Sequence, residues 1–195
     1  LSCIRKAFSL IHNYYDQNYN LANIPPEDPN VYKMLCRADT IRVFQVESRD
    51  QKNFLPRMLP QCFYDLVIQI AIIRPGPIQG NMLHPYIKRR QGKEKVEFPS
   101  NPLKKILDKN LGMPLFQEQA MQIAIISSGF SAEESDRLRR ALATFKNNGD
   151  VSIFHKRFID GIIANGYEKK YSEICFSQIE SFSKYGFTES NAASF

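Results

Sequence analysis

The sequence lacks any long hydrophobic run. Its longest apolar stretch, Leu66 to Ile73, is interrupted by Gln69, whereas a membrane-spanning helix needs ~18 consecutive apolar residues. The N-terminal part contains neither a charged-then-apolar signal segment nor an Arg-rich and Ser-rich transit segment. Because the first residue is Leu1 rather than Met, we expect a piece of a longer, cytoplasmic chain without a membrane span.

Cysteine and histidine are too few and too scattered to indicate a metal site or a disulfide framework. The four cysteines show no C-x-x-C spacing, and the three histidines are isolated from one another. A zinc site needs clustered thiolate and imidazole ligands, and a disulfide-stapled domain needs a denser cysteine pattern. We therefore expect no metal site in this chain and free, reduced thiols at Cys3, Cys36, Cys62 and Cys175.

The composition is that of a soluble protein with an excess of positive charge. The chain has 195 residues, of which 43% are hydrophobic and 24% are charged, enough for one ordinary globular domain. Lys and Arg number 26 against 20 Asp and Glu, which gives a formal net charge of +6. This excess is compatible with a polyanionic partner and equally with an ordinary solvated enzyme.

Much of the positive charge lies between Lys88 and Lys109, where eight basic residues stand against three acidic ones. A basic stretch of this kind can contact the phosphate backbone of a nucleic acid. A solvated loop and helix face is the alternative. The candidate backbone contacts are Lys88, Arg89, Arg90, Lys93, Lys104 and Lys105.

Hydrophobic periodicity predicts a mainly α fold with a few short strands. Apolar residues recur at helical spacing, and the predicted helices cover residues 1–15, 63–73, 117–127, 132–145 and 171–182. For residues 63–73 a strand is the alternative, because the run is short and rich in β-branched residues. Short extended pieces are predicted at 42–46 and 113–116.

Capping residues predict where several helices begin and end. The start signals are Asp28 followed by Pro29, Ser48 with Gln51, Ser131 with Glu134, and Thr188, because such side chains accept hydrogen bonds from free amides of the first turn. The stop signals are the turn Arg74-Pro-Gly-Pro77, Gly129 and Gly186. Glu133 and Asp136 are interpreted as helix-start acids.

Arg139, Arg140 and Lys146 form a candidate triphosphate-binding set. The apolar stripe of the helix at 132–145 turns Arg139 and Arg140 to its flanks, and Lys146 lies two turns beyond Arg139. Guanidinium groups bind phosphate oxygens in a bidentate manner and stay charged. An ordinary basic helix face is the alternative.

Tyr185 and Asn191 flank a second candidate pocket. Tyr185 ends one predicted helix, and Asn191 lies in the first turn of the next. Exposed aromatic rings at such places stack on nucleic-acid bases. A tyrosine that belongs to the core is the alternative.

Five strings carry a resemblance to a known family: TIRVFQVESR, CFYDLVIQIAIIRPGPIQGNMLHPYIKRRQGKE, PLFQEQAMQIA, DRLRRA and FSKYGFTESNAASF. Their order and spacing closely resemble the alpha subunit of the bacterial replicative DNA polymerase, the C family. The strings IPPEDPNVYKMLCRADT, RPGPIQGNMLHPYIKRRQG and PLFQEQ are most similar to the error-prone branch used in damage-induced mutagenesis.

The resemblance implies a DNA polymerase whose fingers region this chain chiefly forms. Residues 1–20 would be the helix that leaves the palm, and residues 21–195 the fingers region, truncated at its C-terminal end. The three palm aspartates that hold two Mg²⁺ ions would lie upstream of Leu1. The isolated fragment would then bind nucleotide without polymerising. A non-catalytic helical module that binds nucleic acid is the alternative function.

The resemblance also implies roles for single residues. Arg139 and Arg140 match the arginines that face the incoming deoxynucleoside triphosphate, and Tyr185 and Ser190 match residues of the nucleotide pocket. For Arg74, Gln117 and Gln119, a structural role at the rim of this site and direct contact with the nucleotide are equal alternatives. Asn191 replaces a histidine that resembles a sugar-packing residue. The implied partners are primer-template DNA, deoxynucleoside triphosphates, a sliding clamp and mutagenesis accessory proteins.

Overall fold

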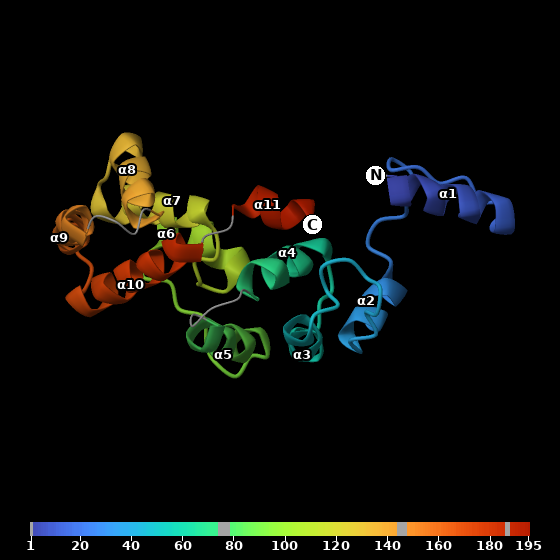
Figure 1. Ribbon diagram of the computed structural model, residues 1–195. Coiled ribbons are helices and arrows are strands. Elements are labelled where there is room, and N and C mark those ends of the chain that lie inside the picture. The colour runs from blue at the N-terminus through green and yellow to red at the C-terminus, as the bar shows by residue number, and fades with distance from the viewer. Residues whose placement is uncertain (1, 74–78, 144–147, 186–187) are drawn as a thin grey trace.

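The computed structural model describes residues 2–73, 79–143, 148–185 and 188–195, and these ranges contain helices and no strand (Figure 1). The prediction of a mainly α fold is therefore confirmed. None of the described helices is both long enough and apolar enough to cross a membrane. In chain order the helices are α1 (Ser2–Tyr15), α2 (Pro29–Cys36), α3 (Arg49–Met58), α4 (Phe63–Ile72), α5 (Gln79–Arg90), α6 (Asn101–Leu107), the 3₁₀ helix η1 (Asp108–Asn110), α7 (Gln117–Ser128), α8 (Ala132–Ala143), α9 (Asn148–Ala164), α10 (Lys169–Tyr185) and α11 (Glu189–Ser194).

The prediction of a short strand at 42–46 is wrong. Arg42 and Gln45 both have φ of 67°, in the left-handed region that a strand does not use. The segment is a series of turns in which Thr40 Oγ1 donates a hydrogen bond to the carbonyl of Val46 at 2.7 Å. The alternating pattern instead reflects a loop that buries Val46 against α2 and α3.

The piece at 113–116 is not helical, and Phe116 at its end is extended, but the piece pairs with no strand in the described chain. All four of its residues are buried. The amides of Leu115 and Phe116 donate to the side-chain oxygen of Gln119, at 2.9 and 3.2 Å. A side chain therefore satisfies the backbone donors that a neighbouring strand would otherwise satisfy.

The predicted capping residues are confirmed where the structure describes them, whereas the helix predicted at 171–182 is longer and runs from Lys169 to Tyr185. Side chains of Asp28, Ser48 and Thr188 cap α2, α3 and α11. Ser131 and Glu134 form the reciprocal capping box at the start of α8, with bonds of 2.8 and 3.1 Å. Gly129 ends α7 at φ of 67°, a conformation that costs glycine little. The stop signals Arg74-Pro-Gly-Pro77 and Gly186 lie outside the described residues.

Two main hydrophobic cores organise the fold. The first surrounds α4, which is helical as favoured and buries Asp65 and all of residues 67–72 against α3, α5, the 113–116 segment and α11. The second lies among α6, α7, α8, α9 and α10. There α9 crosses α7 so closely that a Cβ on Gly161 would lie 2.2 Å from the carbonyl oxygen of Ser128.

The N-terminal helix α1 stands apart from both cores (Figure 1). None of its described residues is buried, and Ile4 and Leu10 are 43% and 55% exposed. Its helical, amphipathic pattern is as predicted. The apolar stripe therefore remains open to solvent in the described chain.

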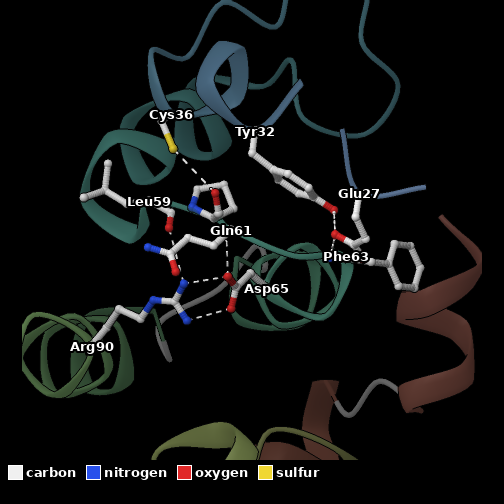
Figure 2. Close-up of polar contacts among 9 residues, drawn as sticks. Glu27, Tyr32, Cys36, Leu59, Gln61, Phe63, Asp65 and Arg90 are labelled. Carbon is white, nitrogen blue, oxygen red and sulfur yellow. Dashed lines mark hydrogen bonds and ion pairs between the residues drawn. The ribbon is translucent and has the colours of Figure 1, made fainter. Parts of the chain in front are cut away.

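The Asp65 carboxylate connects α4 to α5 and to the turn that precedes α4 (Figure 2). Arg90 Nη1 and Nη2 donate to its two oxygens at 2.6 and 2.5 Å, and the amide of Gln61 donates at 2.8 Å. Arg90 Nη2 also reaches the carbonyl of Leu59 at 3.3 Å. Burial alone would lower the pKa of Arg90, but the hydrogen bonds and charge of Asp65 outweigh burial and raise it.

Glu27 fixes the start of α4 from the other side (Figure 2). Its two carboxylate oxygens accept from the amide of Phe63, the first residue of α4, at 3.1 and 3.2 Å. The hydroxyl of Tyr32 donates to the same carboxylate. Burial and this hydrogen bond raise the pKa of Tyr32, so the tyrosine is a neutral donor. The N-terminal turn of α4 is thus held by two carboxylates, Glu27 from the segment before α2 and Asp65 of α4 itself.

Substituting Asp65→Ala should destabilise the chain strongly, because it leaves the mostly buried Arg90 without a counter-ion and the Gln61 amide without an acceptor. We expect a loss of about 3 kcal/mol, the lower end for a broken buried pair because Arg90 keeps some contact with water. Glu94→Ala is the matched control, since it breaks the more exposed Arg89–Glu94 pair and should cost less than about 1 kcal/mol. Urea unfolding measures both; equal losses would contradict this account.

Candidate functional site

Arg139 and Arg140 converge on a single carboxylate on α8. Arg139 Nε and Nη2 donate to Asp136 Oδ1 at 3.0 and 2.8 Å. Arg140 Nε donates to Asp136 Oδ2 at 2.8 Å, and its Nη2 contacts the same oxygen. The three residues follow the i, i+3 and i, i+4 spacing that brings side chains together on one helix face. Two guanidinium forks are therefore held side by side around one anionic group.

The local charge of this cluster remains positive, because one carboxylate stands against two guanidinium groups. The side chains of Arg139 and Arg140 are 38% and 69% exposed. Hydrogen bonds from Arg139 and then Arg140 hold the pKa of Asp136 below its ordinary value. This arrangement can take a polyanion from solvent, because guanidinium groups bind phosphate oxygens as readily as carboxylate oxygens.

The interpretation of Asp136 as a helix-start acid missed this contact. Its spacing to Arg139 and Arg140 was the signal that could have found it. Helix α8 is anchored by Leu138, which is 2% exposed in the second core, and by Ser135, whose Oγ donates to the carbonyl of Met121 at 3.0 Å. These contacts with the core and with α7 fix which face of α8 carries the arginines.

The second candidate cluster lies on α11. Ser190 and Asn191 are both exposed. Ser190 Oγ donates to Thr188 Oγ1 at 3.3 Å, and the Asn191 amide donates to the same oxygen at 3.2 Å. The Asn191 side chain is left at the surface of the first turn. Tyr185 is the last residue of α10, and its side chain lies outside the described part of the structure.

Helix α7 links the two candidate clusters. It contacts α8 through the bond from Ser135 to Met121. It contacts α11 through Glu118, whose Oε2 accepts from the amide of Glu189 at 3.2 Å. In Figure 1, α7 lies between α8 and α11. One helix therefore positions residues that are about 50 places apart in the sequence.

Gln119 is an interior residue. Its burial favours a structural role over direct contact with the nucleotide. It is 6% exposed. Its Oε1 accepts from Asn110 Nδ2 at 2.7 Å as well as from the two amides of the 113–116 segment, and its Nε2 donates to the carbonyl of Ile106 at 3.1 Å. Gln117 is half-buried at the start of α7. Arg74 and Lys146 lie outside the described residues.

The predicted backbone-contact residues divide into two groups. Lys88, Lys93, Lys104 and Lys105 are exposed. Arg89 instead donates to Glu94 and to the carbonyl of Leu111, both at 2.8 Å, and Arg90 is bound to Asp65. The two arginines are held by partners within the fold, so the lysines are the residues of this set that project into solvent.

The described residues contain no group of three or more His, Cys, Asp or Glu side chains that could hold a metal ion. They do not fit the two Mg²⁺ ions that the resemblance implies. The chemistry that the described side chains can supply is the binding of anions by Arg139 and Arg140 and hydrogen bonding by Ser190 and Asn191.

Comparison with known sequences shows the family to which this helical chain belongs. The chain belongs to the family of the bacterial DNA polymerase III alpha subunit finger domain, whose model matches residues 1–166. It is 56% identical to an error-prone DNA polymerase of Sinorhizobium medicae and 55% identical to one of Mesorhizobium japonicum, in each case over 100% of this chain and 18% of the relative. An error-prone DNA polymerase of Brucella suis is 53% identical over 100% of this chain and 19% of the relative.

These relatives confirm the predicted resemblance to C-family polymerases and to their error-prone branch. The chain spans about a fifth of the length of the curated relatives that it matches, between 18% and 19% of each. The finger-domain match confirms the fold class.

The Asp136 cluster predicts how its carboxyl titrates. The hydrogen bonds from Arg139 and Arg140 are fully present above the ordinary pKa of 3.8 and are lost as the pH falls through the lowered pKa of the folded chain. Carbon-13 NMR of the carboxyl should give a midpoint below 3.8. Changing both arginines to Gln should return it towards that value, whereas Arg137→Gln, on another face of α8, should leave it in place. A midpoint unaffected by the double substitution would contradict the cluster.

Proposed function

We propose that the full-length protein is an error-prone, DNA-directed DNA polymerase in which this chain forms fingers and binds the incoming deoxynucleoside triphosphate. Residues 1–20 are the proposed connection to the palm, and residues 21–195 the proposed fingers region. The observation that carries the proposal is the convergence of Arg139 and Arg140 on one carboxylate at an exposed helix face. The finger-domain match and the names of the relatives support it.

In this proposal Asp136 holds the two guanidinium groups ready for the triphosphate. Ordering a long side chain on binding costs about 0.5–1.5 kcal/mol, and the existing bonds to Asp136 reduce this cost for both arginines. Each charge-assisted bond to phosphate then contributes about 1.5–3 kcal/mol. The triphosphate carries more negative charge than one carboxylate, so it competes effectively for the exposed donors of Arg140.

The chemical step requires groups that the described residues do not supply. The resemblance places two Mg²⁺ ions on palm aspartates outside this chain, where they would supply activation of the primer hydroxyl and neutralisation of the leaving pyrophosphate. The residues of this chain instead bind and orient the triphosphate. Arg139 and Arg140 bind its phosphates. Tyr185, Ser190 and Asn191 lie beside its base and sugar. This chain alone should bind nucleotide without polymerising.

We further propose that Lys88, Lys93, Lys104 and Lys105 contact the backbone of primer-template DNA. Their exposure supports this role, since flexible ammonium groups at the surface replace counter-ions along the phosphates. The error-prone names of the relatives extend the proposal to damage-tolerance synthesis in the cytoplasm. A sliding clamp and mutagenesis accessory proteins are then the expected partners.

Arg139→Ala and Arg140→Ala should each impair nucleotide use in the full-length protein. Losing one charge-assisted contact of about 1.5–3 kcal/mol corresponds to a tenfold or larger fall in kcat/KM. We expect a higher KM for the nucleotide and slower single-turnover incorporation, with little change in primer-template affinity. Arg137→Ala, an exposed arginine on the same helix, is the matched control.

Unchanged kinetics in both arginine variants would contradict the triphosphate assignment. Salt-sensitive DNA binding without any nucleotide dependence would instead favour the alternative of a non-catalytic nucleic-acid-binding module.

Asn191→His should sharpen the choice of deoxyribose over ribose. Asn191 is exposed on the first turn of α11, and an imidazole ring there offers a larger, more rigid surface against the sugar than the shorter amide. The ratio of kcat/KM for a deoxy and the matching ribo triphosphate measures this directly. Equal ratios in the two proteins would mean that position 191 does not contact the sugar.

A further inference from the structure

Gln119 lies where the two hydrophobic cores meet. Its Oε1 accepts from the amides of Leu115 and Phe116, at 2.9 and 3.2 Å, and both residues belong to the first core. Its Nε2 donates to the carbonyl of Ile106 at 3.1 Å, and Ile106 packs against the second core. Because Gln119 stands in the first turn of α7, one buried amide fixes the start of this helix relative to both cores.

Asn110 extends this contact to α4. It is 0% exposed and is the last residue of η1. Its Nδ2 donates to Gln119 Oε1 at 2.7 Å, and its Oδ1 accepts from the hydroxyl of Tyr64 on α4 at 3.2 Å. A buried amide without partners is strongly unfavourable, so both bonds constrain where Asn110 lies. Tyr64, Asn110 and Gln119 therefore form one continuous link between α4 and α7.

This link closes a ring of four elements. Helix α11 packs on α4 through the buried side chain of Ala192. The amide of Glu189, the first residue of α11, donates to Glu118 Oε2 on α7 at 3.2 Å. The ring thus runs from α4 through η1, α7 and α11 back to α4. Displacing any one of these elements disturbs contacts on two sides, so the hydrogen bonds of the ring support one another.

Helix α8 is attached to the same ring. Ser135 Oγ of α8 donates at 3.0 Å to the carbonyl of Met121 on α7, two residues beyond Gln119. The N-terminal half of α7 therefore holds both of the candidate clusters. These are the phosphate cluster, Arg139 and Arg140 on α8, and the sugar cluster, Ser190 and Asn191 on α11.

We propose that Asn110 and Gln119, together with Tyr64, are positioning residues that hold the phosphate cluster and the sugar cluster in register. This inference rests on the proposed function and deepens it. Asn110 and Gln119 are buried, so they act through the helices that they fix and not by touching the substrate. The consequence is a preference for a nucleoside triphosphate over a bare polyphosphate, because only the former meets α8 and α11 at a fixed separation.

Tripolyphosphate separates positioning from folding in the full-length protein with primer-template DNA. This probe has phosphates but no sugar or base, so it engages the phosphate cluster alone. Tyr64→Phe removes one bond of the link, and Asn110→Leu removes two. We expect the KM for a deoxynucleoside triphosphate to rise about threefold to tenfold in Tyr64→Phe, the range for one neutral hydrogen bond, and further in Asn110→Leu. The inhibition constant of tripolyphosphate should stay within about twofold of its original value, as for independent sites.

The double variant Tyr64→Phe with Asn110→Leu distinguishes register from stability. Asn110→Leu leaves the Tyr64 hydroxyl without its acceptor, so removing that hydroxyl as well should restore part of the lost thermal stability. The KM should stay raised, because the link between α4 and α7 is still broken. Recovery of the KM together with stability would show a merely structural role.

Tyr167→Phe is the matched control for Tyr64→Phe. It removes a hydroxyl that donates to Ser100 Oγ at 2.8 Å, outside the ring. It should change neither the KM nor the inhibition constant of tripolyphosphate by more than about twofold.

Equal changes in the KM and in the inhibition constant of tripolyphosphate, or no change in either, would overturn the positioning role alone. If Asn110→Leu does not fold, Tyr64→Phe decides between these outcomes. The proposed function fails instead if the unsubstituted protein binds neither nucleotide nor tripolyphosphate, or if its tripolyphosphate binding is indifferent to Arg139→Ala and Arg140→Ala. The positioning role then fails with it.

Discussion

The contact between Asp65 and Arg90 is the constraint on which the arrangement of the first core depends. It joins α4 to the end of α5 and to the chain reversal before α4, and three donors meet one buried carboxylate there. Helix α4 buries nearly its whole length, so a charged group within it must be paired if the helix is to stay in the interior. Because α11 packs on α4, the position of the candidate nucleotide pocket depends on this ion pair.

The second constraint is the anion-binding character of α8. A helix that places two arginines three and four residues after one aspartate holds both guanidinium groups in a shared geometry. The same helix is fixed to α7 by Ser135, and α7 in turn holds the first turn of α11 through Glu118. The proposed triphosphate-binding and sugar-binding elements therefore belong to one connected framework, although each core buries its own apolar residues.

Most helices and their caps could be predicted from sequence because they depend on local signals. The Ser131–Glu134 capping box and the glycine that ends α7 are examples. A strand at 42–46 could not be excluded from the sequence. Two residues with left-handed backbone conformation replace the strand with turns, and their side chains, Arg42 and Gln45, do not predict that conformation. Arg89 and Arg90 are predicted as backbone contacts because Leu111 and Asp65, which bind them, lie more than 20 residues away in the sequence, although Glu94, the other partner of Arg89, is only five residues away. The role of Asp136 was visible in its spacing, but competed with the simpler explanation of a helix-start acid.

Photoaffinity labelling of the full-length protein tests the central claim most directly. A deoxynucleoside triphosphate with a photoreactive group on its terminal phosphate is bound in the presence of primer-template DNA, irradiated, and mapped by mass spectrometry. The account predicts adducts on α8 beside Arg139 and Arg140, which excess unmodified triphosphate abolishes and Arg137→Ala does not. Competed labelling confined to residues outside α8 would contradict it.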